Sequence, residues 1–531
     1  MRFSKALPSS PHCYPSPDGE LIATLLPSSI LIRAVKSLDV LRTIKLPPDL
    51  TGGVTSFTWS PSSTRLLVAV VDQIHTFSAR EGNFHGTARI PSSAAKSAVI
   101  DFGVADHEVC IWSPFGIKLT IINFASSKAV EIANPKFYNA SSATKGCSFR
   151  ANSHHLALLT RSSGKDMISI HSPETRDIER SWYPDTIDAQ GLAWTPDGRW
   201  LVVWESSAQA PRVLFYTSDG HIFKDWRGPL PYESQDMGLQ YSAGVKTVAL
   251  SPDGRRIAIG NGSTCTCILN TPSMMEAMRL RHPQAIQPKD TLQSPLTAKI
   301  WQEQNTFPST GSFSSPVFVK ASQIVTPEWT TLNSLQEPVS GCNFAKFDCS
   351  SSLLATRLEE APGTIWIWDV PSSDLRAVLM YHANVTKLEW HPMQPELLLM
   401  RCEGDSYGSL VFAWDPLSHG PRSVDMAHRL PGALNNSRIY ATWLRAVAES
   451  PALFFSDSAT CMMVSLADSD DETLPWRDAS TPINNISHGD EVSMQSLGRP
   501  ASSSEDAEDS ILINIDDDTS EPDDTFQFIT H

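Results

Sequence analysis

The sequence lacks the features that mark membrane, secreted or disulfide-rich proteins. Its longest apolar run, Leu66 to Val71, is one strand long, whereas a helix needs about 18 apolar residues to span a bilayer. The opening residues, MRFSKALPSSPHCY, contain no apolar core of a signal peptide. The nine cysteines are scattered and form no CxxC pair, which favours reduced thiols. We therefore expect a cytosolic or nuclear protein.

Motifs of known enzyme classes are also missing. There is no phosphate-binding GxxxxGK loop, no GxGxxG after a strand, no HExxH and no GxSxG. Asp101, Asp106, His107 and Glu108 lie close in sequence, but they lack the convergent spacing of a four-ligand metal site. We expect a protein with no catalytic residues, no cofactor and no metal.

Positive charge is scarce at one end of the chain. The net charge is −16, and residues 467–531 contain 17 acidic and two basic residues. The first 466 residues are therefore nearly neutral. A nucleic-acid-binding surface needs clustered basic residues, so this balance argues against one. The acidic segment is also rich in serine and too polar to form a core, which predicts a disordered tail.

A repeated pattern accounts for most of the remaining sequence. A short strand is followed by a Ser-Pro-Asp-Gly-like turn, a second apolar strand and a third strand about ten residues later. Clear copies are YPSPDGELIATLL from Tyr14, WTPDGRWLVVWES from Trp194 and LSPDGRRIAIGNG from Leu250. The turns recur every 43 to 46 residues through much of the chain. This period is typical of WD40 propeller blades.

The number of copies sets the size of the ring. Nine copies can be found, including a degenerate one from Ala98 and a last one at Ile439 to Leu466. Because seven blades are commoner in this fold, we predict an all-β, WD40-type β-propeller in a single large ring of seven to nine blades. The last copy lacks an outer strand, and Arg2 to Leu7 could supply it and close the ring.

These observations predict two regions. Residues 1–466 form the propeller, with a Pro-, Ser-, Thr- and Gln-rich loop insertion at about 281–338, and residues 467–531 form the acidic tail. The insertion joins the outer strand of one blade to the inner strand of the next. It should therefore emerge on the ring face that carries those connections.

Five residues are candidates for a partner surface. In LATRLEEAPGTIWIWDV (354–370), Arg357, Glu359 and Glu360 are charges that blade construction does not require. They should lie on the same face as the insertion. Tryptophan is enriched at binding hot spots. Most tryptophans here fit between blades, but Trp226, Trp301 and Trp329 fall in predicted loops or the insertion, where we expect exposure; the last two complete the candidate set.

The tail contains a second candidate motif. Ile511, Leu512, Ile513 and Ile515 form an apolar run between acidic blocks. Such a segment can add as a strand to the sheet edge of a basic partner, and it resembles a SUMO-interacting motif. The alternative is a solvated acidic tail in which the run has no role.

Several stretches together resemble the WRAP-type WD-repeat family of the centrosome and spindle pole body. They are MRFS with SPDGELIATL, GLAWTPDGRWLVVWES, GVKTVALSPDGRRIAIGNG, RHPQAI and the 354–370 stretch. The resemblance implies a scaffold that anchors microtubule minus ends with a coiled-coil spindle-pole protein and, in some fungi, a minus-end kinesin. An acidic tail would be repelled by tubulin, so microtubule association should be indirect. The alternative is a propeller adaptor of another complex, such as a ubiquitin-ligase substrate receptor or a translation-initiation scaffold.

Overall fold

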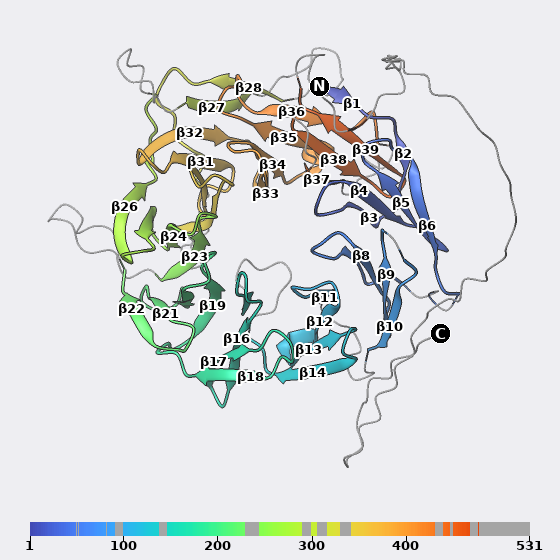
Figure 1. Ribbon diagram of the computed structural model, residues 1–531. Coiled ribbons are helices and arrows are strands. Elements are labelled where there is room, and N and C mark those ends of the chain that lie inside the picture. Colours follow the sequence, from blue (N-terminus) through green and yellow to red (C-terminus); the bar gives the residue numbers. More distant parts are fainter. Residues whose placement is uncertain are drawn as a thin grey trace, which may run out of the picture.

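The fold is a closed ring of β-sheets. In a computed structural model, the described residues are 1–48, 50, 53–80, 82–90, 99–136, 146–228, 244–288, 299–304, 316–329, 341–430, 439–445, 450–467 and 476. They form nine sheets that follow one another in sequence order, so that the last lies beside the first (Figure 1). Within these ranges the helices are two short 3-10 turns, η2 (Pro114–Gly116) and η4 (Asp405–Tyr407). None is long and apolar enough to cross a membrane.

Seven of the nine sheets contain four antiparallel strands, paired in sequence order. They are blade 1, β3 (Cys13–Pro15), β4 (Leu21–Leu25), β5 (Ser29–Ala34) and β6 (Val40–Lys45); blade 2, β7 (Ser56–Trp59), β8 (Arg65–Ala69), β9 (Gln73–Ser78) and β10 (His85–Arg89); blade 3, β11 (Val99–Phe102), β12 (Glu108–Trp112), β13 (Lys118–Asn123) and β14 (Lys128–Ala133); blade 4, β15 (Cys147–Phe149), β16 (Leu156–Ser162), β17 (Lys165–His171) and β18 (Ile178–Trp182); blade 5, β19 (Ala189–Trp194), β20 (Leu201–Glu205), β21 (Val213–Tyr216) and β22 (Ile222–Trp226); blade 6, β23 (Val245–Leu250), β24 (Arg256–Asn261), β25 (Cys265–Asn270) and β26 (Met275–Arg281); and blade 8, β33 (Val385–Trp390), β34 (Leu398–Cys402), β35 (Leu410–Trp414) and β36 (Arg422–Asp425).

The other two blades are irregular. Blade 7 has six strands, β29 (Cys342–Phe347), β30 (Leu353–Leu358), β31 (Thr364–Asp369), β32 (Asp374–Met380), β27 (Lys299–Gln304) and β28 (Val317–Lys320). Blade 9 combines β37 (Tyr440–Leu444), β38 (Ala452–Ser456) and β39 (Thr460–Ser465) with the N-terminal β1 (Arg2–Phe3) and β2 (Leu7–Pro8). The prediction of a single β-propeller ring is confirmed, at nine blades.

The repeated turn forms as its residues dictate. In blade 6 the Ser251 hydroxyl donates to the Asp253 carboxylate at 2.6 Å, and the Arg255 backbone N–H donates to the same carboxylate at 3.0 Å. Gly254 has a φ of +69°, which a glycine adopts without the steric cost of a Cβ. Each Ser-Pro-Asp-Gly tetrad thus reverses the chain between the first and second strands of a blade.

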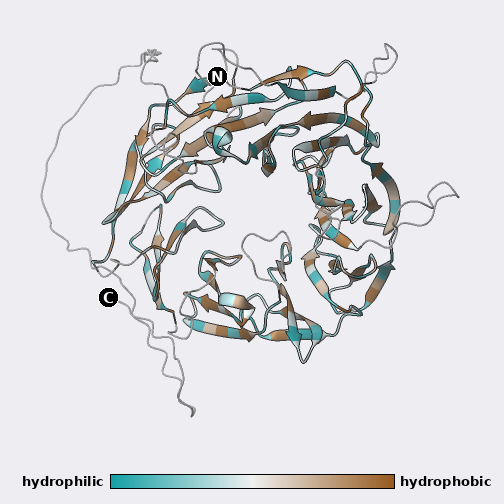
Figure 2. Ribbon diagram, turned by 180° about the vertical axis from the view of Figure 1, so that it is seen from behind, coloured by the Kyte–Doolittle hydropathy of each residue, from teal (hydrophilic) through white to brown (hydrophobic). Residues whose placement is uncertain are grey.

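Buried side chains between neighbouring blades hold the ring together, and Figure 2 shows hydrophobic residues along strands all round it. Between blades 6 and 7, the Nδ1–H of His282 donates to the Thr264 carbonyl at 2.8 Å. Its Nε2 accepts the Thr356 hydroxyl at 2.8 Å, and the Trp368 indole donates to the same hydroxyl at 2.8 Å. Trp366 is fully buried beside the imidazole. The RHPQAI and TIWIWD stretches therefore meet as a packing unit.

The predicted closure by the N-terminus is confirmed. Both β1 and β2 pair antiparallel with β39, which supplies the outer edge that blade 9 otherwise lacks. Ser4 fixes the junction, because its backbone N–H donates to the Met463 carbonyl at 2.9 Å and its hydroxyl accepts the Met463 N–H at 2.9 Å. Leu7 is buried against blade 9, in a cluster that also holds Trp476, a residue that the sequence assigns to the tail.

Deleting residues 1–8 should therefore destabilise the ring. We expect a loss of about 3 kcal/mol in the free energy of unfolding, since the Leu7 side chain leaves the core and β39 becomes an open edge. Urea unfolding followed by far-UV circular dichroism measures it. Lys5→Ala is the matched control, because Lys5 is exposed and its backbone is unchanged. A deletion that unfolds at the same urea concentration as Lys5→Ala would contradict the closure.

Part of the predicted loop insertion is ordered into blade 7. Strand β27 pairs parallel with β32, and β28 pairs antiparallel with β27, so both extend the outer edge of the blade. The repeat pattern could not predict these two strands, because they lie outside the repeated unit. The described chain resumes at Gly341, next to the turn between β30 and β31.

Candidate interaction site on blade 7

The turn between β30 and β31 is fixed by backbone contacts to Gly341, just before β29, and to the start of blade 8. The Glu359 N–H donates to the Gly341 carbonyl at 2.9 Å, and the Val385 N–H donates to the Pro362 carbonyl at 2.9 Å. A side chain at Gly363 would lie 2.7 Å from the Tyr381 carbonyl oxygen, so only glycine fits this approach. The turn therefore lies beside Gly341, the first described residue after the predicted insertion.

The three predicted charges all contact other parts of the ring. The Glu360 carboxylate accepts the Gly341 N–H at 2.7 Å, and Glu360 is only 8% exposed. Glu359 forms an ion pair with Lys246 of blade 6. The Arg357 guanidinium donates to the Val385 carbonyl, and burial lowers the pKa of Arg357. The prediction that blade construction does not use these charges is thus wrong, because Arg357 and Glu359 connect blade 7 to its neighbours and Glu360 holds Gly341 at the start of the blade.

Two of the three tryptophans expected at the surface are buried. Trp301 is 6% exposed, because β27 turns it into the cluster between blades 7 and 8, and Trp226 is 6% exposed on β22. Their predicted exposure is wrong: both lie on outer strands that the sequence pattern does not identify. Trp329 is partly buried and lines a cavity, so it alone keeps an accessible indole surface.

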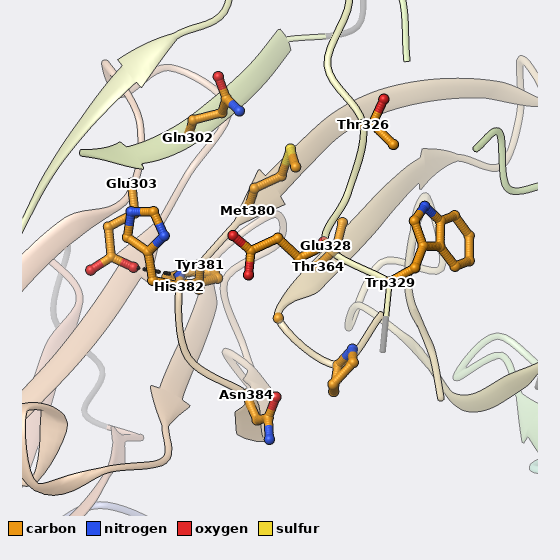
Figure 3. A pocket seen from close by; sticks show the side chains of 12 residues that line it. Gln302, Glu303, Thr326, Glu328, Trp329, Thr364, Met380, Tyr381, His382 and Asn384 are labelled. Atoms are coloured by element: carbon orange, nitrogen blue, oxygen red, sulfur yellow. Dashed lines mark hydrogen bonds between the residues drawn. The ribbon is translucent and has the colours of Figure 1, made fainter. Parts of the chain in front are cut away.

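This cavity lies between the insertion and blade 7 and has a volume of about 220 Å³. Side chains from β27, the 326–329 segment, the β30–β31 turn and the start of the connection to blade 8 form its wall (Figure 3). The residues that line it are Gln302, Glu303, Thr326, Glu328, Trp329, Pro362, Gly363, Thr364, Met380, Tyr381, His382 and Asn384. Residues far apart in sequence thus meet at one place on the predicted partner face.

The other sequence candidates have different outcomes. Within the described ranges, no three His, Cys, Asp or Glu side chains converge in a way that could hold a metal. Glu108 instead forms a buried ion pair with Arg176, and Asp106 binds hydroxyls of blade 2. The tail motif at Ile511, Leu512, Ile513 and Ile515 lies outside the described residues, so its predicted strand addition stays a prediction.

Comparisons with known proteins agree with the repeat pattern. No protein-family model matches the chain. It is 26% identical over 447 residues to the WD repeat-containing protein WRAP73 of Mus musculus, covering 78% of this chain and 87% of that protein. The chain resembles the WRAP-type WD-repeat proteins. It is also 22% identical over 399 residues to an uncharacterised WD repeat-containing protein of Schizosaccharomyces pombe, covering 73% of this chain and 75% of that protein.

Solved structures with a similar arrangement were also found. One is a crystal structure of a eukaryotic initiation factor, with a TM-score of 0.48 and 11% identity over 80% of this chain and 89% of that chain. Another is the Dos1 propeller, with a TM-score of 0.45 and 10% identity over 79% of this chain and 94% of that chain.

Most of the cavity could not be predicted from the sequence. Glu303 lies on β27, Thr364 begins β31 and Tyr381 directly follows β32, and no local motif connects them. The available signal was the adjacent pair Glu328 and Trp329 in the insertion, an acid beside a large aromatic ring in an otherwise Ser- and Thr-rich segment.

Proposed function

We propose that the protein is a non-enzymatic WD-repeat scaffold of the spindle pole body or centrosome. In this role it helps to anchor microtubule minus ends through a coiled-coil partner during spindle assembly. The observation that carries the proposal is the similarity to WRAP73 over most of both chains, in a chain that forms a closed ring of WD-type blades. A nearly neutral propeller with one elaborated blade is compatible with such docking.

Localisation of the tagged protein tests this role. We expect a focus at each spindle pole in mitotic cells, and misplaced or unfocused spindles after depletion. The untagged protein, expressed at the native level, should rescue the depleted cells. An even cytosolic signal together with normal spindles after depletion would overturn the proposal.

The alternative is a propeller adaptor of another complex, such as a ubiquitin-ligase substrate receptor or a translation-initiation scaffold. Affinity purification with mass spectrometry separates the two. Recovery of a coiled-coil spindle-pole protein, with or without a minus-end kinesin, supports the first role. Recovery of ligase or initiation-factor subunits in its place supports the adaptor. The whole 281–338 insertion should not be deleted in this experiment, because it contains His282 and Trp301, which are core residues.

A further inference from the structure

The cavity on blade 7 contains negative charge without a matching positive residue. Glu303 and Glu328 are among its lining residues, and none of the twelve is Lys or Arg. Neither carboxylate forms an ion pair with any residue in the described part of the chain. The two carboxylates therefore give this cavity a negative charge that no lining Lys or Arg offsets.

Glu303 is the deeper of the two carboxylates, since the residue is only 7% exposed. It accepts the His382 backbone N–H at 2.9 Å, a bond drawn in Figure 3, and the Tyr407 hydroxyl at 2.8 Å. Burial and this hydrogen bond both raise the pKa of Tyr407. Both partners of Glu303 are neutral donors, so its charge is oriented but not neutralised.

The cavity wall also contains hydrogen-bond acceptors without donors. Thr364 is 3% exposed, and its hydroxyl has no hydrogen-bond partner among the described residues. The Asn384 amide nitrogen donates to Glu403 at 3.4 Å, which leaves the amide oxygen as an acceptor. Asn384 is exposed, and Thr364 lines the cavity wall, so both oxygens are open to a donor-bearing ligand.

Trp329 adds an aromatic surface at the same cavity. Its side chain is partly buried, beside the exposed Glu328 on the same segment (Figure 3). A guanidinium group carries five N–H donors in a plane, has no acceptor, and stacks on aromatic faces. A lysine ammonium is a compact, strongly hydrated point charge and cannot cover acceptors that are spread over several elements.

We propose that this cavity binds an arginine side chain of a protein partner. The guanidinium forms an ion pair with Glu328 and is attracted by the buried charge of Glu303. It also donates to the oxygens of Thr364 and Asn384 and stacks on the Trp329 ring. The proposal rests on the proposed role as a protein-binding scaffold, but not on where in the cell that role is carried out. Failure of spindle-pole localisation would therefore leave it intact.

Binding of a short peptide to the full chain tests the proposal. The probe is acetyl-Gly-Arg-Gly-amide, measured by saturation-transfer-difference NMR at millimolar concentrations, with the citrulline and lysine peptides as matched ligands. We expect the arginine peptide to bind, the lysine peptide to bind about fivefold more weakly, and the isosteric but neutral citrulline peptide to give no signal. Citrulline or lysine peptides that bind as well as the arginine peptide would overturn the proposal, as would an arginine peptide that does not bind.

Variants locate the binding. Glu328→Gln should lower the affinity for the arginine peptide about tenfold. It should not affect folding, because Glu328 is exposed. Trp329→Ala should lower the affinity for the arginine peptide about fivefold. Glu174→Gln makes the same charge change at an exposed position on blade 4 and should bind as wild type does. If Trp329→Ala does not fold, the affinities of Glu328→Gln and Glu174→Gln for the arginine peptide are compared to test the site. Equal affinities of those two variants would contradict the site.

Discussion

Arg176→Met should lower the free energy of unfolding by about 3–5 kcal/mol. Arg176 of blade 4 and Glu108 of blade 3 are 4% and 3% exposed. The guanidinium donates to both carboxylate oxygens, at 2.5 and 2.8 Å, and to the His154 and Ser172 carbonyls at 2.9 and 3.2 Å. Removing it leaves a buried carboxylate without a cation and two carbonyls without a donor.

A double variant shows that the loss comes from the isolated charge. Glu108→Leu combined with Arg176→Met removes both charges, and we expect it to recover most of the stability, because a well-packed apolar pair can replace a buried ion pair. The matched surface control is Arg80→Met. Arg80 pairs with Asp18 and Glu20 of blade 1, but its side chain is 41% exposed, so the expected loss is below about 1 kcal/mol.

Urea unfolding monitored by circular dichroism gives all three values. A loss for Arg176→Met no larger than that for Arg80→Met would show that the buried pair does not tie blade 3 to blade 4. A double variant as unstable as the single one would show instead that the shape of the side chains, and not the charge, stabilises this contact.

Acid should begin to destabilise the ring near pH 6.5, above the ordinary pKa values of carboxylates. Burial lowers the pKa of His282 to about 4. Burial, followed by the charge of Arg445, lowers the pKa of His391 to about 4. Both imidazoles act as acceptors: His282 for the Thr356 hydroxyl, and His391 for the Gln394 N–H at 2.8 Å. Protonation would remove these acceptors.

The direction of the pH effect follows from proton binding. An unfolded histidine has a pKa of about 6.5, so between pH 6.5 and pH 4 the unfolded chain binds protons that the folded ring excludes. The stability of the ring therefore falls as pH decreases through this window, by about 1.4 kcal/mol per pH unit for each histidine. Above pH 6.5 the two residues contribute no pH dependence.

Unfolding free energies at pH 7.5, 6.0 and 5.0 measure this slope. His282→Asn is less stable at every pH because it loses packing, but its slope between pH 6.0 and 5.0 should be smaller by about 1.4 kcal/mol per pH unit. His221→Gln is the control, because the His221 side chain is 83% exposed, and it should keep the wild-type slope. An unchanged slope in His282→Asn would contradict the exclusion of a proton from this site.

The amino-acid sequence by itself determined that the chain forms one propeller ring, with seven to nine blades. The Ser-Pro-Asp-Gly tetrads, the apolar strands around them and their spacing depend on interactions within about 45 residues, so local physics places the repeats. Even the degenerate third blade and the N-terminal closing strand follow from the same pattern. The prediction that the 359–363 turn and the insertion share a face rests on the same pattern, because turns and connections alternate between the two faces of a propeller.

Only the tertiary structure decided which side chains are free. Trp301 and Trp226 are buried because outer strands pack on neighbouring blades. Strand β27 lies outside the repeated unit and pairs with β32, which is about 75 residues later in the sequence. Glu108 meets Arg176 from 68 residues away, and Glu303 meets Tyr407 from 104 residues away. The repeat pattern covers about 45 residues, so it cannot predict contacts between residues this far apart in the sequence. Whether a charged or aromatic side chain joins two blades or stays available to a partner depends on which residues the closed propeller places beside it.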